Sequence, residues 1–130
     1  MDLTKVESLR LILRQELGKN CKKVFEKKDI GLFFIFNKKS INKLGCDKTI
    51  KASKQNGFNV YEHFEAAENI KELFEHSELI EKHYLIKNSR TETYWLFYCQ
   101  ITDKVFAYMP VVTWGKDEGY IDLYLSKKGE

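Results

Sequence analysis

The sequence predicts an α+β fold in which helices cover one face of an antiparallel sheet of about four to five strands. Three observations lead to this class. An apolar repeat at helical spacing opens the chain, a second one follows in the middle, and aromatic, β-branched segments joined by short turns close it. The 130 residues suit one compact core, so we expect a single domain over 1–130.

The N-terminal segment has the pattern of an amphipathic helix. Asp2 can cap its first turn, Gly18 is a suitable stop, and the apolar positions between them are Leu3, Val6, Leu9, Leu13 and Leu17. The segment lacks the basic start and cleavage site of a signal peptide, and no apolar run is long enough to span a membrane. We therefore expect a cytoplasmic protein with no membrane partner, and its three widely spaced cysteines fit reduced thiols.

A hairpin and a basic loop are predicted next. The hairpin consists of a short polar strand, a turn around Lys28 and Asp29, and an apolar strand over 30–36. That strand should lie inside the sheet and under a helix, because both of its faces are apolar. The residues that follow, up to Gly57, are rich in Lys, Asn, Ser and Gly, and predict a loop with one helical turn over 40–44.

A long helix is predicted from Val60 to about Lys82, packed on one face of the sheet. Asn59 and Glu62 have the spacing of an N-cap residue and its reciprocal partner. When the helix is projected at about 3.6 residues per turn, its apolar side also carries His63.

The rest of the chain predicts a three-stranded meander, with strands over 91–101, 104–114 and 120–126. Pro110 suggests an edge or bulge position in the second of these strands. Alternation in the last strand divides its residues between a core face and an open face. Ile121, Leu123 and Leu125 should face the core, and Tyr120, Asp122 and Tyr124 should face the open side.

Charge is distributed unevenly along the chain. Residues 1–56 contain 14 Lys and Arg against 6 Asp and Glu, whereas residues 57–130 contain 8 against 13. Such asymmetry indicates a polyanionic partner, and the alternative is a solvated, lysine-rich surface.

His63 is the first candidate for chemistry. Near the positive end of a helix its imidazolium form is disfavoured, and a neutral imidazole can accept a proton as a general base. The alternative is a core histidine that is hydrogen-bonded to a backbone carbonyl.

The basic loop and the open sheet face are the other two candidates. Lysines among Ser, Asn and Gly backbone donors can hold phosphates, and sheet hydroxyls beside a lysine can orient them. The loop residues are Lys38, Lys39, Ser40, Lys43, Lys48, Lys51 and Lys54, and the sheet residues are Thr113, Lys116, Tyr120, Asp122 and Tyr124. The alternatives are a solvated loop and ordinary exposed sheet residues.

Other chemistries have little support in the sequence. Glu72, His76 and His83 should be solvated residues on the polar side of the long helix, and no HExxH motif or Cys pair suggests a metal. The phosphate-binding patterns GxxxxGK[ST] and GxGxxG are absent, so no cofactor is expected. Ser40, His63 and Asp122 have the residue types of a hydrolase triad, without the GxSxG elbow.

Three phrases of the sequence carry a resemblance to a known fold. They are “FFIFNKKSINKLG”, a strand leading into a basic turn, “VYEHFEAAENIKELFEHSELIEKH”, a histidine-bearing helix, and “YIDLYL”, a final strand. Together with the order of elements from about Val24 to Leu125, they resemble the barnase–EndoU–colicin–RelE-type nucleases, above all the phage and prophage members. The resemblance implies metal-independent RNA cleavage, in which a base takes the proton of the ribose 2′-OH and that oxygen attacks the adjacent phosphate.

Carried over by residue, the resemblance implies that His63 is the general base or acid and that Lys43 is the phosphate cation. Tyr124 or Thr113 would orient the substrate from the sheet, and Lys38, Lys39, Ser40 and Lys116 are the further phosphate-binding candidates. The sequence lacks a second well-placed histidine and an arginine in the sheet strands. Either a Tyr or Lys takes the missing role, or the activity is lost.

Three functions are therefore compatible with the sequence. The first is a small endoribonuclease of phage, prophage or toxin type, with RNA as substrate and an immunity or antitoxin protein as a further partner. The second is a non-catalytic RNA- or protein-binding module on the same fold. The third is an adaptor that uses Trp95, Tyr108 or Trp114 at a protein interface.

Overall fold

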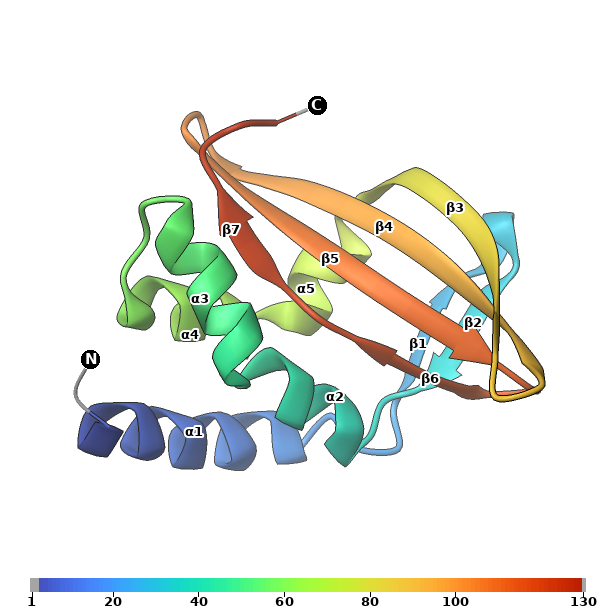
Figure 1. Ribbon diagram of the computed structural model, residues 1–130, viewed down its shortest axis with the longest axis horizontal. Coiled ribbons are helices and arrows are strands. Elements are labelled where there is room, and N and C mark those ends of the chain that lie inside the picture. The colour runs from blue at the N-terminus through green and yellow to red at the C-terminus, as the bar shows by residue number, and fades with distance from the viewer. Residues whose placement is uncertain (1–2, 130) are drawn as a thin grey trace.

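The computed structural model describes residues 3–129, and it confirms the α+β class (Figure 1). The elements are α1 (Leu3–Gly18), β1 (Val24–Lys27), η1 (Lys28–Ile30), β2 (Leu32–Ile35), α2 (Lys38–Leu44), α3 (Asp47–Gln55), α4 (Val60–Glu68), α5 (Ile70–Glu75), β3 (Glu78–Lys87), β4 (Arg90–Thr102), β5 (Val105–Trp114), β6 (Glu118–Ile121) and β7 (Tyr124–Ser126). An antiparallel five-stranded sheet has the order β3-β4-β5-β6, with β7 also paired to β5, and β1 and β2 form a separate two-stranded sheet.

The first helix and the first hairpin form where they were predicted. α1 buries Val6, Leu13 and Leu17, whereas its predicted cap, Asp2, lies outside the described residues. The prediction that the apolar strand lies inside the main sheet is wrong. Within the described chain β2 pairs with β1 in the smaller sheet, and the side chain of Phe33 is 41% exposed.

The predicted basic loop is instead two helices, α2 and α3. α2 contains the helical turn that was expected over 40–44, but α3 was not predicted. Its buried side is small and mostly polar, because it consists of Thr49, Ile50 and Ser53. A pattern of apolar residues therefore does not reveal this helix, whose buried hydroxyls bond to groups distant in the sequence.

The predicted long helix is wrong beyond Glu68. α4 begins with the expected capping box, in which Asn59 and Glu62 exchange backbone-to-side-chain hydrogen bonds of 2.9 Å each. Asn69 ends α4, α5 is a short helix, and the chain is already a strand at Glu78. Pairing with β4 overrides the helix propensity of the Glu, Leu and Lys residues in this segment.

β3 and β4 form a hairpin with a two-residue turn. Asn88 and Ser89 lie between the paired residues Lys87 and Arg90, and their φ angles are 52° and 63°. Two consecutive left-handed residues are the type I′ geometry, whose twist matches that of the flanking strands. This hairpin adds one long edge strand to the predicted meander.

The predicted meander is confirmed, with two refinements. The last strand divides into β6 and β7, and Pro110 lies in the central strand β5 rather than at an edge. The Pro110 carbonyl accepts a 2.8 Å hydrogen bond from the Asp122 N–H, on the side where β6 gives way to β7. Because the N and O of a residue in an antiparallel strand point to the same side, the missing donor of Pro110 faces this break.

Helices cover one face of the larger sheet and leave the other face open (Figure 1). Phe74 of α5 packs on Phe97 of β4, with ring centroids 5.2 Å apart, and on Phe25 of β1, at 5.6 Å. The predicted core residues of the last strands, Ile121, Leu123 and Leu125, are all buried on this side. Among residues 3–129, no helix has the length and apolar character needed to cross a membrane.

Candidate functional site

His63 lies in the core rather than in a groove. Its side chain is 0% exposed, its Nε2 is 2.8 Å from the Leu44 carbonyl oxygen, and its Nδ1 is 2.7 Å from the Ser53 hydroxyl oxygen. Because a carbonyl oxygen only accepts, Nε2 must carry the proton, and Nδ1 accepts from the Ser53 hydroxyl. Burial lowers the pKa of His63 and the Leu44 bond opposes this only in part, so the ring is neutral.

This histidine connects several elements. The Ser53 oxygen also accepts a 3.0 Å hydrogen bond from the Leu125 N–H, so a chain of hydrogen bonds runs from β7 through α3 and His63 to the end of α2. Both ring nitrogens are occupied, and neither is available to a substrate. This geometry does not fit the expectation that His63 acts as a general base or acid. It fits the alternative, a core histidine that is hydrogen-bonded to a backbone carbonyl.

Two further candidate residues have structural partners as well. Ser40 is fully buried, and its hydroxyl oxygen accepts a 3.0 Å hydrogen bond from the Ile121 N–H, so it is not free to bind phosphate. Asp122 accepts a 2.8 Å bond from the Thr49 hydroxyl. Ser40, His63 and Asp122 are therefore not assembled into a triad, because each bonds to a different group.

The open face of the larger sheet carries rows of aromatic rings. The strand register places Tyr98, Tyr108 and Tyr124 side by side in one row, and it places Tyr94 and Tyr120 in another. Tyr108 and Tyr124 stack with their centroids 5.3 Å apart and their planes 6° from parallel. Tyr120 and Tyr124 thus lie on the face where the alternation of the last strand predicted them.

Three cations contact two rings at the corner where α2 meets β6. The Arg90 guanidinium carbon is 4.2 Å from the centroid of Trp114, and the Lys39 ammonium nitrogen is 4.8 Å from it. The Lys43 ammonium nitrogen is 4.9 Å from the centroid of Tyr120. We call Lys39, Lys43, Arg90, Trp114 and Tyr120 the basic corner. Cation–π contacts of this kind are electrostatic attractions between the cation and the ring face.

The basic corner joins two predicted lysines to a residue that the sequence analysis missed. Arg90 was overlooked because the predicted strand began one residue later, and it pairs with the buried carboxylate of Glu92 at 2.7 Å. Lys39 and Lys43 make no ion pair with any carboxylate of the described chain. Their charge is therefore available to an anionic ligand.

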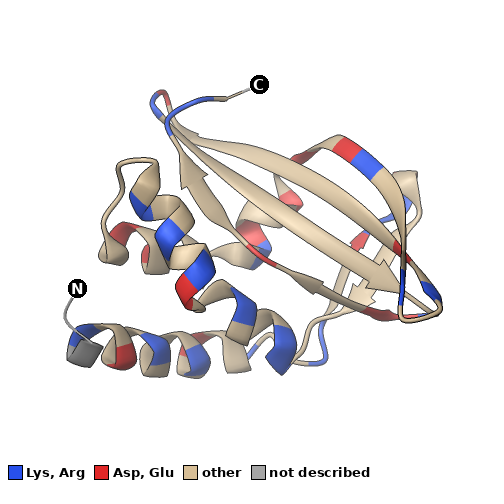
Figure 2. Cartoon of the chain, in the orientation of Figure 1, with Lys and Arg blue, Asp and Glu red and all other residues tan. Residues whose placement is uncertain are grey.

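α2 and α3 continue this positive charge along the β6–β7 edge of the sheet (Figure 2). Lys38, Lys48 and Lys51 are exposed on these helices. Burial raises the pKa of Asp122, while its hydrogen bonds and the charges of Lys43 and Lys48 act in the opposite direction. The lysines therefore lie close enough to the sheet edge to influence a carboxyl group there.

The sequence predicted His83 on the polar side of a helix, but the structure places it on β3. Its ring stacks on Tyr94 with centroids 4.7 Å apart, and its Nδ1 is 3.5 Å from the Glu81 carboxylate. The register runs from His83 through Tyr94 and β5 to Tyr120, which is three strand spacings or roughly 14 Å. The register thus separates this imidazole from Tyr120 of the basic corner by two intervening strands.

Thr113 and Lys116 line a cleft that contains no other predicted site residue. This cleft of about 350 Å³ lies between the two sheets, on the covered face of the larger sheet. Thr113 therefore lies on the opposite face of the sheet from Tyr124 and from Tyr120, whose ring Lys43 contacts.

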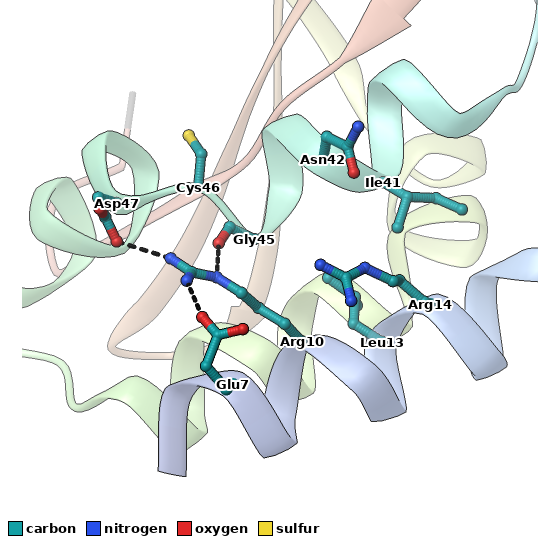
Figure 3. A pocket seen from close by; sticks show the side chains of 9 residues that line it. All are labelled: Glu7, Arg10, Leu13, Arg14, Ile41, Asn42, Gly45, Cys46 and Asp47. Atoms are coloured by element: carbon teal, nitrogen blue, oxygen red, sulfur yellow. Dashed lines mark hydrogen bonds and ion pairs between the residues drawn. The ribbon is translucent and has the colours of Figure 1, made fainter. Parts of the chain in front are cut away.

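A hollow of about 300 Å³ lies between α1 and the turn from α2 to α3 (Figure 3). The Arg10 Nε donates a 2.7 Å hydrogen bond to the Gly45 carbonyl, and its terminal nitrogens bond to the carboxylates of Glu7 and Asp47. Two carboxylates neutralise this guanidinium. Arg10 thus anchors α1 to the neighbouring helices and does not form an anion site.

The aromatic residues considered for an adaptor interface do not form an exposed patch. Trp95 is 4% exposed and Tyr108 is 8% exposed, so Trp114 alone of these three reaches solvent to a larger extent. The part of the chain that the structure describes also has no group of three or more His, Cys, Asp or Glu side chains that could hold a metal ion.

Comparison with models of known families identifies a match over most of the chain. The sequence model of a family described as large polyvalent protein-associated domain 3 matches residues 4–120, which is most of the chain. No curated protein matches, and no solved structure matches. The match supports the phage association that the resemblance implied, but it shows no relation to a nuclease family.

Proposed function

The chain belongs to the large polyvalent protein-associated domain 3 family, and since membership assigns no activity, we propose from the geometry that it is a non-catalytic module binding single-stranded RNA. The observation that carries the proposal is the basic corner, where Lys39, Lys43 and Arg90 lie over two aromatic rings of the open face.

The chemistry of the open face fits an unpaired strand. Proteins that bind single strands stack bases on aromatic side chains and hold the backbone phosphates with Lys and Arg. Tyr94, Trp114 and Tyr120 are half-buried and present their rings on this face. Lys39 and Lys43 come from α2, beside the sheet, so their charge lies where the backbone of a stacked strand would pass.

Binding is better supported than cleavage. Cleavage needs a proton acceptor and a cation at the same phosphate. His63 has no free nitrogen, and His83 lies three strand spacings from Tyr120, whose ring Lys43 contacts, so the geometry supports neither imidazole acting together with Lys43.

Fluorescence anisotropy with a labelled single-stranded oligoribonucleotide of about ten nucleotides tests the proposal. The variant Lys39→Gln/Lys43→Gln should bind more weakly, and the slope of log Kd against log salt should fall by about 1.4, because two phosphate contacts are removed. Trp114→Leu should weaken binding about 5- to 150-fold with little change of slope, because it removes stacking and not charge.

Lys19→Gln/Lys23→Gln is the matched control, since it removes two exposed lysines near the end of α1 and the start of β1. It should leave affinity and slope nearly unchanged. If the two double variants lose RNA affinity equally, binding depends only on net charge and the proposal is overturned. An absence of RNA binding at low salt would also overturn it. A DNA oligonucleotide of the same sequence measures the contribution of the 2′-hydroxyls.

The same oligonucleotide incubated with excess protein in EDTA tests for turnover. We expect it to stay intact while it binds. Cleavage that is lost in His83→Ala would overturn the non-catalytic part of the proposal and assign the exposed imidazole of β3 a role in the reaction.

A further inference from the structure

A cleft of about 350 Å³ lies between the two sheets, and the proposed function makes no use of it. Its floor is the covered face of β4 and β5, where Thr93 is paired with Thr113. Lys82 of β3 and Lys116 of the β5–β6 turn flank this floor, and Phe33 of β2 closes the cleft from the smaller sheet. The β1–β2 hairpin lies behind this end of the larger sheet in Figure 1.

The floor of the cleft offers a hydroxyl donor. The Trp95 indole N–H donates a 3.0 Å hydrogen bond to the Thr113 hydroxyl oxygen, which leaves the hydroxyl proton to be donated elsewhere. Within residues 3–129 this hydroxyl has no acceptor, and Thr91 and Thr93 line the same space from β4. A ligand with several acceptor oxygens would satisfy these groups.

Positive charge in the cleft has no balancing carboxylate. The Lys82 ammonium nitrogen is 4.4 Å from the centroid of Trp95, Lys116 lies in the exposed turn, and no Asp or Glu is among the described residues that line the cleft. Neither lysine forms an ion pair within the described chain. Two ammonium groups beside free hydroxyls select an anion rather than a neutral or cationic ligand.

We propose that this cleft binds a nucleotide through its phosphomonoester group. Lys82, Lys116 and Thr113 supply charged and neutral donors for the phosphate oxygens, while Phe33 supplies aromatic surface for the base. The volume lies in the range of small-molecule sites, roughly 300–1,000 Å³. A free nucleoside monophosphate and the terminal nucleotide of a strand share this chemistry. The inference does not rest on the proposed function, because Lys82, Lys116 and Thr113 take no part in it.

Tryptophan fluorescence reports on this cleft directly. The chain has two tryptophans, Trp95 and Trp114, and both line the cleft. Titration with AMP, GMP, CMP and UMP should give a saturable change for at least one of them. The matching nucleoside, which lacks the phosphate, should bind at least about tenfold more weakly, because it loses the charge-assisted hydrogen bonds.

Substitutions assign the contacts. Lys82→Gln/Lys116→Gln should weaken nucleotide binding about tenfold or more, and Thr113→Val should also weaken it because the isostere lacks the hydroxyl. Thr113→Ser keeps the hydroxyl that Thr113→Val removes, and it should bind the nucleotide like the parent protein. If Thr113 acted only through the packing of its methyl group, Thr113→Ser would lose affinity instead. Lys104→Gln, in the exposed turn between β4 and β5, is the control for charge and should bind like the parent protein.

Three results would overturn the proposal: no saturable change with any of the four nucleotides, equal binding of the nucleoside, or an equal loss in Lys104→Gln. The source of the nucleotide is tested in Trp114→Phe, where Trp95 alone reports. A signal that requires the 5′-phosphate of an oligoribonucleotide assigns the cleft to strand ends, and a signal with mononucleotides alone assigns it to free nucleotides. Failure of RNA binding at Lys39 and Lys43 would leave the mononucleotide titration unaffected.

Discussion

Ser53 and His63 form a buried pair whose hydrogen bonds favour one protonation state. A second proton on the ring would meet the Ser53 hydroxyl proton at Nδ1, so the Ser53 O–H would have to give up its hydrogen bond to the ring. The folded protein therefore holds the ring neutral, and burial lowers the pKa of His63 below its ordinary value of 6.5. In the unfolded chain no such restraint acts.

The first prediction concerns the pH dependence of this pair. As pH falls below 6.5, the unfolded state binds a proton that the folded state excludes, so the free energy of unfolding should decrease until the folded pKa is reached. The decrease from this residue is at most about 1.4 kcal/mol per pH unit. Urea denaturation over about pH 7.5 to 5 measures it. His63→Gln should lose this part of the slope, and an unchanged slope would contradict the assignment.

Asp122 has the opposite linkage. Burial raises its pKa, so the folded state binds the proton more tightly than the unfolded state, and the stability due to the protonated form is lost as pH rises through the folded pKa. Asp122→Asn keeps an acceptor for Thr49 and for the Leu123 N–H without a charge. The variant should gain stability relative to the parent as pH rises from about 4 to 7 in urea denaturation. A difference that stays constant with pH would refute this linkage.

At the scale of elements, the sequence predicts segments whose signals are local. α1, the first hairpin, the capping box of Asn59 and Glu62, and the pairing of β4 with β5 all follow from spacing within a few residues. α3 could not be predicted, because its buried hydroxyls bond to groups about 70 residues further along the chain. Thr49 bonds to Asp122, just before β7, and Ser53 bonds to Leu125 of β7. A short polar pattern carries no information about such partners.

The candidate site follows the same division. Tyr120 and Tyr124 were placed on the open face by simple alternation, and Lys39 and Lys43 were identified from a run of lysines. His83 was misplaced because the segment that contains it forms a strand only by pairing with β4. The burial of His63 could not be derived from its helix alone, because α2, α3 and β7 supply the groups around it.

The β3–β4 turn gives a prediction at this scale. Ser89 has a φ of 63°, a conformation that glycine adopts without strain and β-branched residues avoid. Ser89→Gly should stabilise the hairpin by about 0.5–1 kcal/mol, and Ser89→Val should destabilise it by a similar amount or more. Hydrogen exchange of the β3 and β4 amides, together with the melting temperature, measures both. Shifts of the same sign in the two variants would contradict the turn geometry.

At the scale of the whole molecule, the two sheets meet where Gly119 of β6 passes Phe34 of β2. A Cβ at position 119 would lie 2.8 Å from the Val112 carbonyl oxygen and 2.9 Å from the Cβ of Phe34. Beside this contact, the Ile35 N–H donates a 3.0 Å hydrogen bond to the Asp117 carbonyl. The relative position of the sheets, and with it the width of the cleft between them, depends on the missing side chain of Gly119.

Gly119→Ala should therefore destabilise the protein by about 1–3 kcal/mol, because the added methyl group meets a backbone oxygen and a buried ring that cannot move independently. Gly18→Ala is the matched control: its Cβ would meet no atom within 4 Å, and stability should change by less than about 0.5 kcal/mol. Urea denaturation of both variants gives the comparison. If Gly119→Ala is as stable as Gly18→Ala, the sheets can separate slightly at little cost, and the cleft between them is adjustable rather than fixed by this contact.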